Sequence, residues 1–193
     1  MKLIVASLYI ALSLGSTFGQ PVTTSPVRAR CTLTQTEAPE IRGIKLGMTA
    51  ERISQTVPQI KAELSTLKSA SALEHSFGLA RIPVRPPATE PKYSGVESFN
   101  LVFLDEKLVD MAIRYEPVPW RNVNDFLQKF IDAYRLPPIA LWQGDDEEKG
   151  LQCDDIELSA KRDYFRVSIG SYRKTVQSRD EAAKEKARRD FRP

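Results

Sequence analysis

The sequence has few histidines and cysteines, two side chains that often act as metal ligands or in nucleophilic catalysis. Its 193 residues include one histidine, His75, and two cysteines, Cys31 and Cys153. A single histidine excludes a metal site built from several histidines, and it argues against a Ser–His or Cys–His nucleophilic pair. We therefore expect no metal and no cofactor, and the sequence nominates no catalytic residue.

Glycine-rich nucleotide-binding motifs are also missing. A P-loop has four residues between its glycines and then Lys-Ser/Thr, whereas Gly43 and Gly47 have three residues between them and precede Met48-Thr49. We interpret this stretch as the entrance to a helix. The acidic run 145–148 does not match the spacing of an EF-hand loop, so it is predicted to be a solvated turn.

Neither sign of charge dominates the chain. Removing Lys2 with a signal peptide would take the 28 basic residues to 27 against 25 acidic ones, a formal net charge of +2. Nucleic-acid binding would require a concentrated basic stripe. We therefore expect no nucleic-acid partner.

Long apolar runs are confined to the N-terminus. Lys2 precedes the apolar residues 3–14, and Thr17 and Gly19 provide small side chains at the −3 and −1 positions of a cleavage site. We predict a signal peptide over residues 1–19, cleaved after Gly19, and a mature chain without a transmembrane segment. The expected location is secreted or periplasmic.

The two cysteines have one intramolecular pairing. In an oxidising compartment Cys31 and Cys153 are predicted to form a disulfide, with two buried free thiols or intermolecular bridges as the alternatives. Closing so long a loop would contribute about 4 to 5 kcal/mol in the chain-entropy treatment.

The mature sequence divides into three parts. Residues 20–40 have no apolar period and are predicted to form an extended arm, and residues 41–175 form one α+β domain. Within it, Thr49 caps a short helix that ends at Pro58, and the variable segment 59–96 contains a possible helix over 60–72 and a loop over 81–94. Residues 176–193 form a polar, charged C-terminal helix, with Ser178 as a candidate cap.

The strongest periodic patterns lie between residues 97 and 169. Alternating apolar residues predict strands over 97–104 and 107–115, joined by Asp105-Glu106, and a second hairpin around the turn at 161–163. Between them, a broad apolar helix begins at Asn122 and ends before Pro137. This order predicts an antiparallel sheet of about four strands from two αββ units, with both helices on one face.

The segments "GIKLGMTAERISQTVP" and "LVFLDEKLVDMAIRY" carry a family resemblance. They resemble the outer-membrane assembly lipoproteins of the SmpA/OmlA type and the wider β-lactamase-inhibitor-protein-like fold. The matching positions are Gly47, Met48, Thr49, Phe103, Asp105 and Leu108. The resemblance covers about a third of the chain and implies a non-enzymatic domain that binds proteins with its sheet or loops. This chain has no lipoprotein cysteine, because Cys31 follows Arg28-Ala29-Arg30.

We therefore predict a non-catalytic domain whose partner is another envelope or secreted protein. Tyr93, Trp120 and Trp142 are candidate binding residues, because they lie in or near predicted loops and aromatic side chains dominate interface energetics. The alternatives are a small exported hydrolase with a carboxylate-based site in the acidic loop, and a passive envelope component.

Overall fold

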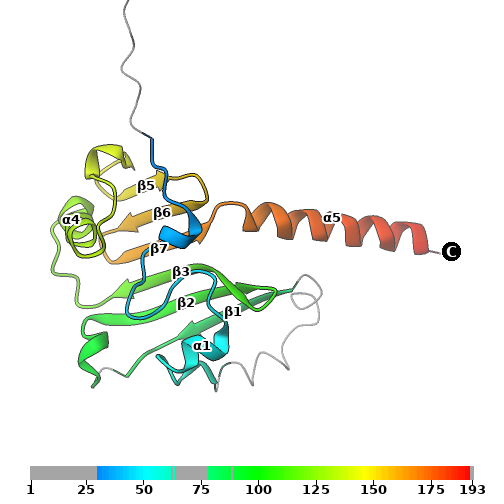
Figure 1. The fold of residues 1–193 in the computed structure, drawn as a ribbon, viewed down its shortest axis with the longest axis horizontal. Coiled ribbons are helices and arrows are strands. Elements are labelled where there is room, and N and C mark those ends of the chain that lie inside the picture. The colour runs from blue at the N-terminus through cyan, green and yellow to red at the C-terminus, as the bar shows by residue number, and fades with distance from the viewer. Residues whose placement is uncertain (1–29, 62, 64–77, 88, 192–193) are drawn as a thin grey trace, which may run out of the picture.

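The computed structural model describes residues 30–61, 63, 78–87 and 89–191 (Figure 1). Within them, seven strands form one antiparallel sheet in the order β1-β2-β3-β7-β6-β5-β4. The strands are β1 (Leu79–Val84), β2 (Val96–Leu104), β3 (Lys107–Tyr115), β4 (Gln143–Gly144), β5 (Glu148–Gln152), β6 (Ile156–Lys161) and β7 (Tyr164–Ile169). The α-helices are α1 (Ala50–Ser54), α4 (Val123–Tyr134) and α5 (Tyr172–Asp190), and the 3-10 turns are η1 (Gln35–Glu37), η2 (Pro91–Tyr93) and η3 (Ile139–Leu141).

The sheet is built from two similar halves. β1, β2 and β3 form one half and β5, β6 and β7 the other, and the last strands of the two halves, β3 and β7, pair antiparallel at the centre. α1 precedes the first half and α4 precedes the second. Each half therefore contains three strands, so the predicted αββ units, with two strands each, were wrong.

One face of the sheet carries the main core. A row of paired residues crosses six strands on this face, and all of its side chains are buried. They are Ile82, Leu101, Met111, Val167, Leu158 and Leu151. α4 packs on this face, where Phe130 stacks on Phe165 of β7 at 4.3 Å between ring centroids.

Local sequence explains the elements that were predicted most clearly. The Asn122 side chain accepts a hydrogen bond from the Asp125 amide at 3.0 Å, which caps α4 as expected. Thr49 caps α1 in the same way, accepting from the Arg52 amide at 3.2 Å. Asp105 and Glu106 both have positive φ, of 48° and 64°, so the two-residue turn between β2 and β3 has the twist that suits a hairpin.

Several predictions about the sheet were wrong. The structure has seven strands instead of about four, and the predicted loop 81–94 contains most of β1 and η2. β1 was missed because Pro83 argued against a strand, but β1 is the edge of the sheet, where proline is tolerated. β4 and β5 were missed because their sequence is polar and glycine-containing.

The predictions at the ends of the domain had mixed outcomes. α5 begins at Tyr172, six residues before the suggested cap Ser178, and the described part of the arm contains η1. Most of the predicted helix over 60–72 lies outside the described residues. Cys31 and Cys153 form the predicted disulfide, which ties the arm to the end of β5 across 122 residues.

Candidate functional site

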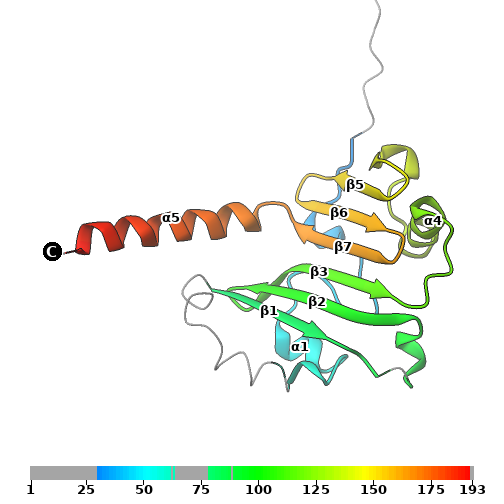
Figure 2. The same ribbon diagram turned by 180° about the vertical axis from the view of Figure 1, so that it is seen from behind.

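The two faces of the sheet are covered differently. α1, α4 and the turn around Ile41 and Ile44 pack on one face, whereas in the described part of the chain only the beginning of α5 packs on the other. Figure 2 shows this second face, with the strands in front of the N-terminal segment. We call it the open face and define it by Asn100, Asp110, Ala112, Arg114, Glu157, Ser159, Lys161, Tyr164, Arg166 and Ser168.

A β-bulge in β3 positions the acid at the centre of this face. Val102 pairs with Asp110 but Phe103 pairs with Leu108, so Val109 is an extra residue in the strand. Leu108 belongs to the main core, whereas Val109 belongs to the small apolar cluster under α5. The extra residue thus re-aims the strand and brings Asp110 onto the open face.

Asp110 is the most completely bonded carboxylate of the open face. Its side chain is buried, and it accepts from Arg166 Nε at 2.8 Å, from Arg166 Nη2, and from the Tyr172 hydroxyl at 2.7 Å. Hydrogen bonding to Asp110 raises the pKa of Arg166, so this guanidinium stays charged. The cluster joins β3, β7 and α5, which fixes the side-chain positions at the middle of the face.

Other charges on the open face are also paired within the chain. Arg114 lies 3.4 Å from Asp163 and 3.9 Å from Glu97, and Lys161 lies 3.2 Å from Glu148. These pairs are partly exposed, so each contributes little to stability. Much of the charge on this face is therefore compensated by partners within the chain.

Tyr164 is the partly exposed aromatic side chain of the open face, since Tyr172 of α5 is buried against the sheet. Burial raises the pKa of Tyr164, so its hydroxyl remains neutral and can both donate and accept a hydrogen bond. A half-buried tyrosine between Arg114 and Lys161 in the sheet register is the type of anchor found at protein interfaces.

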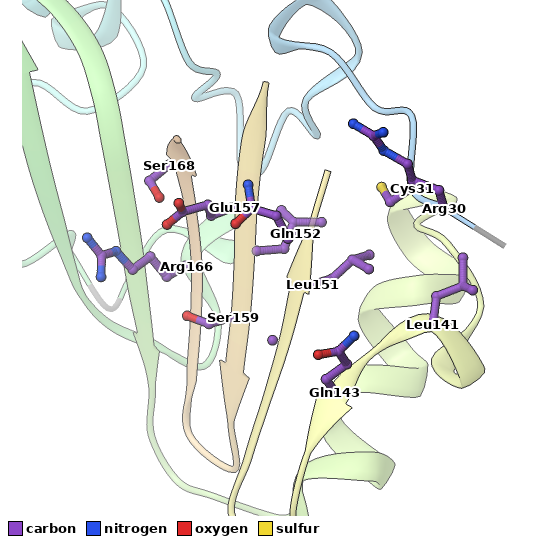
Figure 3. A pocket seen from close by; sticks show the side chains of 12 residues that line it. Arg30, Cys31, Leu141, Gln143, Leu151, Gln152, Glu157, Ser159, Arg166 and Ser168 are labelled. Atoms are coloured by element: carbon purple, nitrogen blue, oxygen red, sulfur yellow. The ribbon is translucent and has the colours of Figure 1, made fainter. Parts of the chain in front are cut away.

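A trough of about 590 Å³ lies at the β5 end of the open face (Figure 3). Its polar lining includes Gln143, Gln152, Glu157, Ser159 and Ser168, and its far end reaches the disulfide at Cys31. Figure 3 shows Arg166 directed away from this end, toward the strand that carries Asp110. Among the described residues that line the trough, Glu157 is the one carboxylate.

α5 limits the open face on one side. Tyr172 and Val176 pack on an apolar patch that includes Leu79, Val102 and Leu104, and Arg179 forms two hydrogen bonds to Asp105 at 2.8 and 2.6 Å. Beyond these contacts residues 181–191 are exposed, and both views show the helix leaving the body of the domain. α5 thus covers the β1–β3 end and leaves the rest of the face accessible.

The predicted aromatic residues are placed differently from one another. Tyr93 is 1% exposed and its hydroxyl donates to the Thr56 carbonyl, while Trp142 is 6% exposed and its Nε1 donates to the Pro137 carbonyl at 3.1 Å. Neither ring is presented to a partner, so both belong to the core. Trp120 is half-buried against Phe126, and its binding role remains a prediction.

The acidic loop forms a turn between β4 and β5. Asp145 Oδ1 accepts from the amides of Glu147 and Glu148 at 2.9 and 3.0 Å, and these hydrogen bonds lower the pKa of Asp145. All four acids of the run are exposed. Among the described residues, no three His, Cys, Asp or Glu side chains are placed to hold a metal ion.

Sequence reasoning missed the open face because its residues are ordinary polar positions of predicted strands. The alternation of the two hairpins gave a usable signal, since it indicated that one side of each strand is polar. The described residues contain no helix long and apolar enough to cross a membrane. No protein-family model, curated protein or solved structure matches this chain.

Proposed function

We propose that this chain is an exported, non-catalytic domain, secreted or periplasmic, that binds another protein with its open face. The observation that carries the proposal is the contrast between the faces. One is filled by α1, α4 and a continuous apolar core. The other holds polar side chains, of which Asn100, Arg114 and Lys161 are exposed and Glu157, Ser159, Tyr164 and Arg166 are partly exposed. The first face forms the main core of the fold. The open face is left available for contacts with a partner.

The open face is prearranged for binding. The hydrogen bonds among Asp110, Arg166 and Tyr172 hold its centre in one geometry, so little side-chain freedom is lost there when a partner docks. Around this centre, Asn100, Ser159 and Tyr164 offer uncharged hydrogen-bonding groups. A polar, sheet-shaped partner surface with matching donors and acceptors fits this chemistry better than an apolar helix does.

Export is supported by two independent features. The N-terminal sequence has the charge, the apolar run and the small residues of a signal peptide. The disulfide has both of its cysteines buried, and structural disulfides are typical of oxidising compartments. The mass of the exported product tests this part: loss of residues 1–19 and of two thiol protons is expected, and a retained N-terminus or two free thiols would contradict it.

Site-specific cross-linking tests the binding face. A photo-reactive side chain in place of Ser159 lies on the open face, and the same group in place of Ala133 lies on the exposed side of α4. Illumination in the producing cells should give a discrete protein adduct from position 159. Excess unmodified protein should suppress that adduct.

Position 133 is the matched control, because it is equally easy to substitute but lies on the other side of the molecule. An adduct from 133 and none from 159 would reject the open face as the contact surface. Equal, non-competed adducts from both positions would also reject it, because they would indicate collisional labelling.

A further inference from the structure

Glu157 differs from the other charged residues of the open face. Those residues form ion pairs with acids or bases of the same chain, and they are Asp110, Arg114, Lys161 and Arg166. Glu157 is only partly exposed, yet its side chain forms no ion pair and no hydrogen bond with any residue that the structure describes. A partly buried carboxylate is stabilised by a counter-ion or by donors. The open face therefore contains one negative charge that a ligand can compensate.

Two hollows meet at Glu157 and give a ligand room to reach it. The first is the trough of about 590 Å³ shown in Figure 3. The second has a volume of about 540 Å³ and lies beside the start of α5, where Gly170 and Ser171 line it. Gln152 and Glu157 line both hollows. The carboxylate can therefore be approached from either space.

The sheet register places neutral oxygen acceptors beside this carboxylate. Glu157 of β6 pairs with Gln152 of β5 on one side and with Ser168 of β7 on the other, so the three residues form one row on the open face (Figure 3). The Gln152 Nε2 donates to the Cys153 carbonyl at 3.2 Å, which leaves the amide oxygen of Gln152 as an acceptor. Ser168 is largely buried but lines the trough, and it adds a hydroxyl.

Most cations that line the two hollows are held by other acids. Arg30 Nη2 donates to Asp154 at 2.7 Å, and Arg166 Nε donates to Asp110 at 2.8 Å. Lys174 lines the second hollow, where it is exposed and forms no ion pair within the described part of the chain. Holding so flexible a side chain against Glu157 would cost conformational entropy. Lys174 is therefore a weak competitor for the carboxylate.

We propose that the row formed by Gln152, Glu157 and Ser168 binds an ammonium group, which the partner protein supplies as a lysine side chain. The source of the lysine rests on the proposed function, because Glu157 and Ser168 belong to the open face. An ammonium has three N–H donors on one compact charge, which suits a carboxylate flanked by an amide oxygen and a hydroxyl. A guanidinium is planar and is matched best by two parallel acceptors, so arginine suits this mixed set less well.

The test is a titration of the intact exported protein, followed by the amide NMR signals of residues 157 and 168 at constant ionic strength. The probes are the Nα-acetyl methylamides of lysine, of norleucine and of arginine. Norleucine is the matched control, because it has the length of lysine without the charge. Saturable shifts are expected with the lysine probe. The norleucine probe should bind at least about tenfold more weakly, and the arginine probe should also bind more weakly than lysine.

Three variants make the assignment specific. Glu157→Gln keeps the shape of the side chain but removes its charge, so it should weaken binding of the lysine probe at least about tenfold. Its unfolding should be unchanged, because no ion pair is lost. Glu147→Gln makes the same change in the exposed acidic turn before β5 and should leave the affinity unchanged. Lys174→Gln removes the competing cation and should strengthen binding about twofold.

Several results would overturn the proposal. They are the absence of a saturable shift with the lysine probe, equal binding of lysine and norleucine, and tighter binding of arginine than of lysine. Equal losses in Glu157→Gln and Glu147→Gln would also overturn it, because they would indicate general attraction to negative charge.

The ammonium site and the binding face can fail separately. A competed adduct from position 159 without binding of the lysine probe would reject the ammonium site and keep the open face as the contact surface. Binding of the lysine probe that depends on Glu157, without an adduct from position 159, would support the ammonium site and reject that contact surface.

Discussion

The two faces of the sheet use neighbouring residues of the same strands for different purposes. Leu101, Met111 and Val167 are paired across β2, β3 and β7 and are fully buried in the main core. At the neighbouring positions of β3 and β7, the open face carries the polar residues Asp110 and Ser168. The contrast indicates that apolar burial stabilises the fold from one side, while hydrogen bonds and ion pairs arrange the other side without covering it.

The largest loss of stability is expected from truncating a core side chain on the face of the sheet that α1 and α4 cover. Phe165→Ala removes a fully buried ring that stacks on Phe130, and should lower the free energy of unfolding by about 3–5 kcal/mol. Its neighbour Tyr164 points to the open face. Tyr164→Ala should therefore lower the free energy of unfolding by less than half as much as Phe165→Ala does. Urea denaturation of both variants measures the difference, and equal losses would mean that the faces are not divided as described.

Removal of the disulfide should have the next largest effect. The double variant Cys31→Ala/Cys153→Ala frees the arm from the end of β5 and should lower the free energy of unfolding by about 2–4 kcal/mol. Both sulfur atoms lie in buried residues, so mild reductant should leave the native bond intact. Thermal unfolding with and without reductant tests this, and an unchanged midpoint in the double variant would contradict it.

A smaller loss is expected at the centre of the open face. Asp110→Asn leaves Arg166 without its counter-ion and should lower the free energy of unfolding by about 2 kcal/mol. Asp163→Asn removes the more exposed partner of Arg114 and should cost less than about 1 kcal/mol. If the two variants were equally stable in denaturant titrations, Asp110 would not organise the face.

Tyr172→Phe should have a milder effect that is local to α5. The variant keeps the ring on its apolar patch but loses the hydroxyl that donates to Asp110, which should cost about 1 kcal/mol. Hydrogen exchange should rise in the first turns of α5 while the exchange in β2 and β6 stays unchanged. Uniformly faster exchange across the sheet would show that Tyr172 supports the whole fold.

The smallest effect on stability is expected from acid, at the ion pair between Arg179 of α5 and Asp105 of the β2–β3 turn. Hydrogen bonds from Arg179 lower the pKa of Asp105 below its usual 3.8. A depressed folded-state pKa gives stability that is present above pH 3.8 and is lost as pH falls through the folded value. The contact of α5 with the β2–β3 turn should therefore loosen in strong acid, seen as faster exchange near Arg179. Asp105→Asn should remove this acid-dependent step, and a step that persisted in the variant would assign it to another group.

Elements defined by local patterns could be predicted from the sequence. The β2–β3 and β6–β7 hairpins follow from alternating apolar residues, and α4 follows from its wide apolar face and the Asn122 cap. The disulfide could be predicted because the sequence has two cysteines, which allow a single intramolecular pairing. Each of these depends on residues that are close in sequence or unique in it.

Elements defined by long-range contacts could not be predicted in the same way. β1 contains a proline that only its place at the sheet edge makes acceptable, and α5 starts early because Tyr172 and Val176 have an apolar patch to cover. Asp110 and Arg166 are 56 positions apart in the sequence, and their pairing depends on the β-bulge in β3. No local sequence motif predicts that bulge. The burial of Tyr93 and Trp142 depended on the same tertiary packing.

Binding of the cross-linked partner, once identified, tests the central claim most directly. Its affinity can be measured for the native chain, for Ser159→Arg on the open face, and for Ala133→Arg on the exposed side of α4. We predict that Ser159→Arg weakens binding at least about tenfold with unchanged unfolding, while Ala133→Arg binds like the native chain. Native affinity in Ser159→Arg, or an equal loss in Ala133→Arg, would contradict the assignment of the open face as the binding surface.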